Sequence, residues 1–112
     1  MYRGIVMKYF YKINELHGTD CHEFFKGKWN GTFWSYDSIY IYDEDFSSSG
    51  LKRVISRVVP DYSPYADSEI DSEMWEKICS EAKLSALEAV KEASFWVKET
   101  LEEHGIFTIL GI

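Results

Sequence analysis

The chain has 112 residues, 46% of them apolar and 17% aromatic, with only two prolines. This length and composition predict a single folded domain over residues 1–112 rather than a disordered chain. The net charge is −7 and the pI is near 4.9. This balance argues against direct nucleic-acid binding, because nucleic-acid binders carry basic surfaces.

The location of the protein follows from what the sequence lacks. No apolar run approaches the roughly 18 residues that a membrane span needs, so we expect no membrane association. Lys8 and Lys12 interrupt the N-terminal apolar stretch, unlike the apolar segment of a signal peptide. Two cysteines in a chain without an export signal predict reduced thiols and a cytoplasmic location.

The first predicted element is a strand over residues 5–13. Apolar and aromatic residues recur there at every second position, and the lysines fall between them, as expected for a half-buried strand. The side chains predicted to share its buried face are Ile5, Met7, Tyr9, Tyr11 and Ile13.

Asn30-Gly31 predicts a β-hairpin between residues 22–29 and 32–36. This dipeptide suits a type I′ turn, in which both central residues have positive φ. A two-residue loop pairs Trp29 with Thr32, Gly27 with Trp34 and Phe25 with Tyr36. The hairpin face predicted from that register carries Phe25, Trp29, Trp34 and Tyr36.

The middle of the chain changes from strand to helix. Residues 39–42 (Ile-Tyr-Ile-Tyr) predict strand, which ends at the three acids that begin with Asp43. The helical spacing of apolar residues from Leu51 to Val58 predicts a short helix stopped by Pro60, although its β-branched residues leave a strand as the alternative. Residues 60–68 predict a loop.

The C-terminal part predicts two helices and a last strand. Asp71 is the expected N-cap of the first helix, with a buried stripe of Trp75, Ile78, Cys79 and Ala82. Ser85-Ala86-Leu87-Glu88 has the pattern of a capping box, which predicts that a second helix begins there. The residues predicted to line its buried face are Leu87, Val90, Ser94, Val97 and Leu101. Gly105 ends this helix, and residues 106–110 predict a strand inserted into the sheet.

These elements predict an α+β fold. We expect a mainly antiparallel sheet, built from the N-terminal strands, the Asn30-Gly31 hairpin and the C-terminal strand. Two or three helices should cover one of its faces.

Catalytic and metal-binding patterns are weak. His17, Cys21 and His22 lie close together, but their spacing matches no standard zinc motif. Cys21 and His22 are adjacent, so on a strand they point to opposite faces and cannot form a nucleophile–base pair. The glycines form no phosphate-binding loop. We therefore expect no enzyme, no metal and no cofactor.

The acidic surface is the strongest functional feature of the sequence. Residues 37–112 carry seven bases and sixteen acids, and six of these acids lie between Arg57 and Lys77 without a base among them. Aromatic residues run through the same segments, and Tyr and Trp are preferred anchors of protein interfaces. The predicted partner-binding residues are Tyr40, Tyr42, Asp43, Glu44, Asp45, Asp61, Tyr62, Tyr65, Asp67 and Glu69. Acids in the first turn of a helix also have a structural explanation, because they stabilise the helix dipole.

The function that fits best is non-enzymatic binding of a basic protein partner such as a toxin, a nuclease or a nucleic-acid-binding protein. A bacterial or phage inhibitor, or an immunity protein that neutralises a toxin, has this character, and we expect it as a monomer or homodimer.

Two alternatives stay open. One is a small enzyme or ligand-binding domain with a pocket between the aromatic face of the sheet and the helices. Its lining would be Phe25, Trp29, Trp34 and Tyr36, with His22 or His104 as the polar group. The other is a homo-oligomeric structural subunit in which an exposed tail, residues 106–112, pairs between chains.

Overall fold

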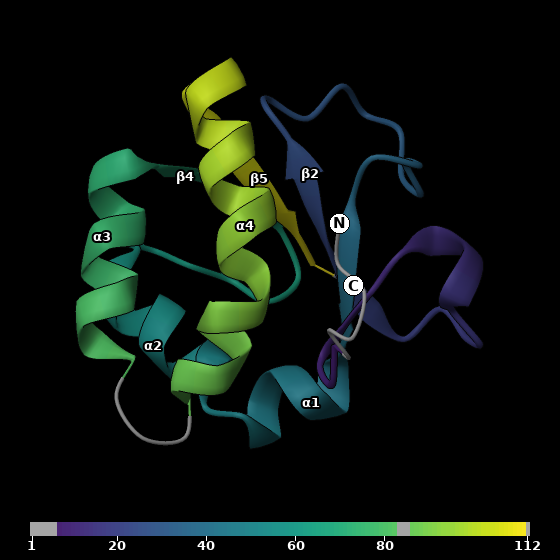
Figure 1. The fold of residues 1–112 in the computed structure, drawn as a ribbon, viewed down its shortest axis with the longest axis horizontal. Helices are drawn as coiled ribbons and strands as arrows, with labels where there is room; N and C mark the ends of the chain where they lie inside the picture. Colours follow the sequence, from purple (N-terminus) through teal and green to yellow (C-terminus); the bar gives the residue numbers. More distant parts are fainter. Residues whose placement is uncertain (1–6, 83–85, 112) are drawn as a thin grey trace.

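One antiparallel sheet and four helices make up the fold of residues 7–82 and 86–111, which the computed structural model describes. The strands are β1 (Phe10–Tyr11), β2 (Cys21–Lys26), β3 (Ile39–Tyr42), β4 (Asp67–Asp71) and β5 (Ile106–Leu110). They lie in the order β1-β3-β2-β5-β4. The helices are α1 (Asp43–Ser48), α2 (Leu51–Val58), α3 (Ser72–Glu81) and α4 (Leu87–His104), and a 3-10 helix, η1, covers Ile13–Glu15. The predicted α+β fold is confirmed (Figure 1).

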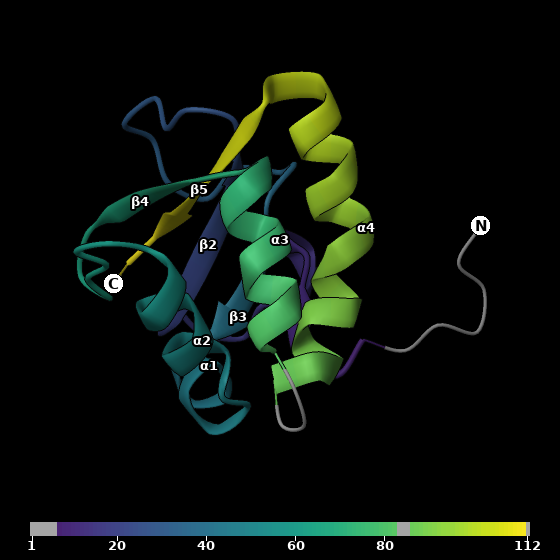
Figure 2. The ribbon, with the colours of Figure 1, turned by 90° about the vertical axis from the view of Figure 1, so that its left-hand side faces the viewer.

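The helices and the sheet enclose the hydrophobic core on one side of the sheet, with α3 and α4 side by side over it (Figure 2). Side chains alternate between the faces of a strand, so Phe24 and its cross-strand partners Ile39 and Ile109 point toward the helices. Edge contacts of Phe107 with Trp75 and Trp96 join β5 to α3 and α4. We call the other side of the sheet, which carries Cys21, Glu23, Tyr40, Thr108 and Leu110, the open face.

Helix α2 settles the choice between helix and strand for residues 51–58. It covers Leu51–Val58, buries Leu51, Val54 and Ile55, and ends before Pro60. The N-cap of α3 is also confirmed, because Asp71 Oδ1 accepts a hydrogen bond of 2.9 Å from the backbone N–H of Met74. Trp75 and Ile78 are buried as expected.

Helix α4 is present, but its buried stripe differs from the prediction. The stripe consists of Ala89, Val90, Ala93, Trp96, Val97 and Thr100. Val90 and Val97 were expected in it, whereas Leu87 is 37% exposed. Small residues decided the difference, because alanines let α4 approach the sheet closely while Trp96 fills the space beside them. The predicted capping box involves Ser85, which lies outside the described residues.

The C-terminal strand is confirmed, and it occupies an inner position. β5 pairs with β2 on one side and with β4 on the other, so both of its edges are used. The expectation of an exposed tail that pairs between chains is therefore wrong for residues 106–110. β4 was not predicted: the expected loop over 60–68 includes its first two residues, and its sequence, Asp67–Asp71, has four polar residues of five. It is an edge strand, where charged side chains are tolerated and discourage pairing with other chains.

The predicted N-terminal strand is much shorter than expected. Only Phe10–Tyr11 pairs with β3, and η1 replaces strand from Ile13 onward. The predicted faces are also exchanged, because Phe10 is the buried side chain whereas Tyr9 and Tyr11 are only partly buried. Glu92 of α4 holds this segment, as its carboxylate accepts backbone hydrogen bonds of 2.8 Å from Lys8, 2.8 Å from Tyr9 and 3.2 Å from Phe10. Ile5 lies outside the described residues.

The predicted Asn30-Gly31 hairpin is wrong. β2 ends at Lys26 and its hairpin partner is β3, so residues 27–38 form a loop between them (Figure 1). Gly27 leaves the strand with φ of +78°, and His104 occupies the space where a side chain would stand. Gly31 has positive φ but Asn30 does not, which excludes a type I′ turn. The Asn30 side chain instead accepts a hydrogen bond of 2.9 Å from the backbone N–H of Thr32.

Within the described part of the chain, no helix combines the length and the apolar character needed to cross a membrane.

Candidate functional site on the open face

A buried carboxylate fastens the 27–38 loop to the open face. Glu23, on β2, is 3% exposed. Its Oε1 accepts a hydrogen bond of 2.8 Å from the Trp34 backbone N–H, and its Oε2 accepts one of 3.0 Å from the Ser35 N–H. The hydroxyl groups of Ser38 and Tyr40 donate to Oε2 at 2.6 and 3.3 Å. Hydrogen bonds to a charged acceptor are stronger than neutral ones, so this carboxylate fixes the conformation of the loop.

Trp34 is held in a strained and exposed position by this arrangement. Its φ is +68°, a left-handed conformation that costs a non-glycine residue about 1–2 kcal/mol. The indole stacks on Tyr40 at 5.8 Å between ring centroids but stays 43% exposed. Strained backbone tends to occur where function requires a fixed geometry. A large aromatic side chain held in this way is a candidate binding residue.

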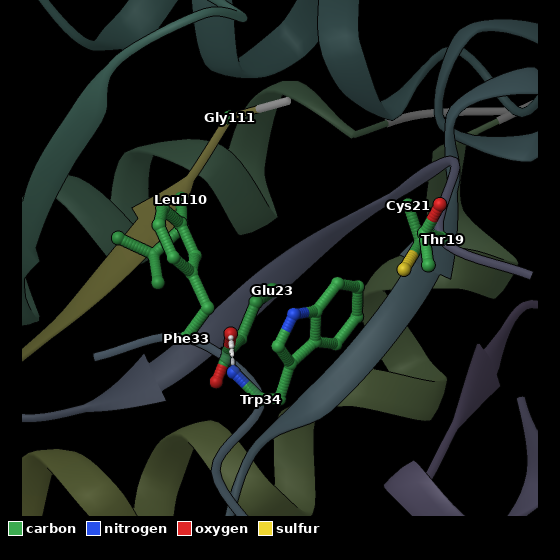
Figure 3. A pocket seen from close by; sticks show the side chains of 7 residues that line it. All are labelled: Thr19, Cys21, Glu23, Phe33, Trp34, Leu110 and Gly111. Carbon is green, nitrogen blue, oxygen red and sulfur yellow. Dashed lines mark hydrogen bonds between the residues drawn. The ribbon is translucent and has the colours of Figure 1, made fainter.

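Trp34 forms one wall of a pocket of about 210 Å³, which we call the open-face pocket. The residues that line it are Thr19, Cys21, Glu23, Phe33, Trp34, Leu110 and Gly111. Figure 3 shows Phe33 and Leu110 toward one end of it and Thr19 and Cys21 toward the other, with the indole between them. Phe33 is 47% exposed, so the loop presents two aromatic rings to solvent at this place.

The lining of the open-face pocket offers binding surface rather than reactive groups. Burial, reinforced by the nearby charges of Glu23 and Asp20, raises the pKa of the Cys21 thiol to about 11. The thiol is therefore protonated at neutral pH and is a weak nucleophile. Both oxygens of Glu23 are already engaged by the loop. The pocket is also smaller than the roughly 300–1,000 Å³ of typical small-molecule sites.

His22 lies on the other face of the strand, as predicted from its position beside Cys21. It is fully buried, and its Nε2 lies 2.8 Å from Asp43 Oδ1. Its ring contacts Phe46 with 4.4 Å between the centroids. This His–Asp pair joins β2 to the start of α1. Among residues 7–82 and 86–111, no group of three His, Cys, Asp or Glu side chains is arranged to hold a metal ion.

The predicted acidic residues fall into two groups. The first is the start of α1, where Asp43, Glu44 and Asp45 form the first turn of the helix. Glu44 is exposed, whereas Asp43 is only partly exposed and is used by His22. Tyr62 lies close enough for the Asp43 charge to raise its pKa, although burial is the larger cause.

The second group of acids lies on β4. Asp67 pairs with Leu110 and Glu69 with Thr108, so both carboxylates stand on the open face. Asp71 is on the same face of β4, and all three are exposed. Among the described strand residues that point to the open face, there are carboxylates but no lysine or arginine.

The open-face pocket lies between the two groups of acids. At one end, Asp20 separates the lining residues Thr19 and Cys21, and its carbonyl oxygen accepts a hydrogen bond of 2.9 Å from the Asp43 backbone N–H. At the other end, Leu110 pairs with Asp67, and the Gly111 N–H donates to the Ala66 carbonyl at 3.1 Å. Of these acids, Asp67 pairs directly with a residue that lines the pocket, whereas Asp43 holds His22 on the other face of the sheet.

The predicted aromatic residues of the patch are placed less uniformly. Tyr65 is 80% exposed, and Tyr42 is partly buried. Tyr62 is also partly buried, and its hydroxyl is buried without a hydrogen-bond partner among the described residues. Tyr40 is fully buried beneath Trp34 and donates a hydrogen bond of 2.7 Å to the Ser35 carbonyl, so it supports the loop and cannot contact a partner directly. Asp61 is exposed, with a left-handed φ of +59°.

The residues of the alternative pocket are not brought together. Phe25 is buried, Tyr36 is 80% exposed and His104 lies beside Gly27. Only Trp34 of that set lines the open-face pocket, which is on the side of the sheet opposite to the helices.

Three residues of this site were not among the predicted partner-binding residues. Trp34 was assigned to a hairpin face and to the lining of the alternative pocket, while Phe33 and Glu23 received no role in partner binding. The density of aromatic residues over 29–36 was the available signal. The clamp itself depends on a contact between β2 and a loop eleven residues later, which no local pattern reveals.

Models of known protein families, curated proteins and solved structures were compared with the chain, and none of them matches it significantly.

Proposed function

We propose that this chain is a protein-binding module that uses its open face to bind a basic surface of another protein. In this proposal the module is not an enzyme, and it acts in the cytoplasm of a bacterium or of a phage-infected cell. It would bind and occlude a cationic functional surface, as an immunity protein that neutralises a toxin or an inhibitor of a nuclease does. The main binding residues are Trp34 and Phe33 together with the acids of β4.

The observation that carries the proposal is the exposed, strained Trp34 above a buried carboxylate. The left-handed backbone at Trp34 costs stability, and its side chain still leaves 43% of its surface in water although it stacks on Tyr40. A binding surface gains affinity from such a residue, because a rigid aromatic side chain loses little entropy when it binds. Tryptophan is also enriched among residues that dominate the energy of interfaces.

Charge supports a basic partner. The chain contains no lysine or arginine from residue 29 to residue 51 or from residue 58 to residue 76. These segments include the loop, the start of α1 and β4, which surround the open-face pocket. Acidic side chains there would attract a cationic partner and accelerate its association.

Asp43 is unsuitable for testing the charge, because it holds His22. A better reversal is Asp67→Lys with Glu69→Lys, since both side chains are exposed on the edge strand. A matched control is Glu88→Lys with Glu102→Lys, which changes the net charge equally but on exposed positions of α4. For the aromatic anchor, Trp34→Ala is matched by Tyr36→Ala, a more exposed aromatic residue of the same loop outside the pocket.

The experiment is affinity capture from source-cell lysate with these four variants and the unaltered chain, washed at low and at high salt. We expect one basic protein to be retained by the unaltered chain and by both controls. It should be lost with Trp34→Ala and weakened by the Asp67/Glu69 reversal, most strongly at low salt, where exposed charges are least screened. Capture that is equal for all variants, or that yields no basic protein, would contradict the proposal.

A further inference from the structure

The open-face pocket has the size and walls of a receptor for one side chain. Its volume is about 210 Å³, and the walls formed by Phe33, Trp34 and Leu110 are apolar. The floor of the pocket is the sheet itself, where Cys21 and Glu23 are almost fully buried. The indole N–H of Trp34 faces the pocket in Figure 3.

The rim of the pocket is acidic at the end formed by Leu110. Asp67 is exposed there, in direct register with Leu110, and Glu69 is exposed on the same face of β4. At the other end, Thr19 and Cys21 line the pocket, and Asp20 between them belongs to the opposite face because side chains alternate along an extended chain. The carboxylate inside the pocket, Glu23, is saturated by the loop.

Apolar walls beneath a negative rim match one kind of side chain. Lysine and arginine carry a long apolar stem that packs on hydrophobic surface and a charged end that stays near water or a counter-charge. An aliphatic residue would match the walls but gain nothing from the rim, and an acidic residue would be repelled by it.

We propose that the open-face pocket receives a single lysine or arginine side chain of the partner. The stem lies against Trp34, Phe33 and Leu110, and the cationic head lies beside Asp67 at the rim. This proposal rests on the proposed function, since it specifies how the same surface recognises a basic protein.

The probes are three short capped peptides, Gly-Gly-Xaa-Gly-Gly, in which Xaa is lysine, arginine or norleucine. Norleucine has an unbranched aliphatic side chain like the stem of lysine but no charge. Binding is followed by NMR at the indole N–H resonances of the tryptophans, and the Trp34 resonance is assigned by its absence in Trp34→Phe. Single side chains bind weakly, so we expect dissociation constants on the order of 1–10 mM.

The lysine and arginine peptides should shift the Trp34 resonance, and the norleucine peptide should bind at least about tenfold more weakly. Asp67→Asn should weaken the lysine peptide by roughly three- to tenfold. Asp20→Asn, which removes an acid from the other face, should leave the binding nearly unchanged. Tyr36→Ala should leave the binding unchanged.

Equal binding of norleucine and lysine would overturn the proposal, because the site would then be only apolar. Saturation of a resonance other than that of Trp34, or no shift of Trp34 up to roughly 50 mM peptide, would overturn it as well. The capture experiment separates this failure from failure of the proposed function. A basic partner that still depends on Trp34 and on the β4 acids would keep the function while excluding insertion of a cationic side chain.

Discussion

Replacing Glu23 by glutamine tests whether the carboxylate holds the 27–38 loop. The substitution preserves size and shape, but it exchanges one acceptor oxygen for an NH₂ group that can only donate. In the better orientation, the amide oxygen takes the place of Oε2 and keeps the hydrogen bonds from Ser35, Ser38 and Tyr40. The NH₂ group then faces the Trp34 N–H, which now lies 2.8 Å from Oε1.

The cost follows from these contacts. One hydrogen bond to a charged acceptor disappears, two donors face each other, and the three remaining bonds become neutral. Loss of a bond to a charged group costs about 1.5–3 kcal/mol. We therefore expect Glu23→Gln to lower the free energy of unfolding by about 2–4 kcal/mol, a large fraction of the roughly 5–15 kcal/mol of a typical domain.

The measurement is urea denaturation followed by tryptophan fluorescence, combined with limited proteolysis of the loop. Glu99→Gln is the matched control, because Glu99 makes an exposed contact of 3.6 Å with Lys26 and should contribute less than about 0.5 kcal/mol. Glu23→Gln should be less stable than this control and should be cleaved faster within residues 27–38. A Glu23→Gln protein as stable and as resistant as Glu99→Gln would refute the clamp.

Three further substitutions probe other parts of the fold. Glu92→Ala removes the carboxylate that accepts from Lys8, Tyr9 and Phe10, so it should cost about 1–3 kcal/mol and abolish protection of the Tyr9 amide in hydrogen exchange; unchanged protection would count against the contact. The raised pKa of Cys21 means that the folded state holds this proton more tightly than the unfolded state, for which the ordinary value is 9.0. Stability from this thiol is thus complete below pH 9 and lost as the pH rises toward 11, so the advantage of the unaltered chain over Cys21→Ser should shrink over that range in urea titrations at several pH values; a constant difference would refute the shift. The Trp34→Gly variant should be more stable than the Trp34→Ala variant by about 1 kcal/mol, the reverse of the ordinary order, because alanine keeps the strain of positive φ. Thermal denaturation of the two variants tests this, and a more stable Trp34→Ala would refute it.

The sequence predicted α2, α3, α4 and the C-terminal strand because each depends on local chemistry, whereas α1 was taken for the acidic end of a strand. The signals that begin and end these helices act within one or two turns. They are the N-cap at Asp71, the stop before Pro60, and Gly105 at the end of α4. Residues 106–110 are apolar apart from Thr108, as expected for a strand that is paired on both edges and buried.

The prediction for the N-terminal half was wrong where a contact with a distant part of the chain outweighed a local preference. Asn30-Gly31 is a strong hairpin pattern, yet the edge of β2 is taken by β3, and Gly27 turns the chain away beside His104. The faces of residues 9–11 were exchanged because Glu92, more than eighty residues later, fixes how β1 meets the sheet. β4 was missed because an edge strand needs little apolar character.

The prediction of the candidate site was wrong in part, for a related reason. The acids of the patch were identified from composition alone, because surface charge does not depend on the details of packing. Which aromatic residues are exposed does depend on packing, so Tyr40 was taken for a contact residue while the tryptophan that covers it was overlooked.

The loop explains how one chain can combine a stable sheet with a binding surface on the same face. The β2–β3 pair alone would leave Tyr40 and Glu23 exposed, and an exposed carboxylate beside apolar residues would bind water rather than a partner. The 27–38 loop covers both, and the hydrogen bonds to Glu23 oppose the strain at Trp34. A substitution at Glu23 should therefore damage binding and stability together, whereas truncation of Trp34 should damage binding far more than stability. That contrast distinguishes a residue that supports the site from one that contacts the partner.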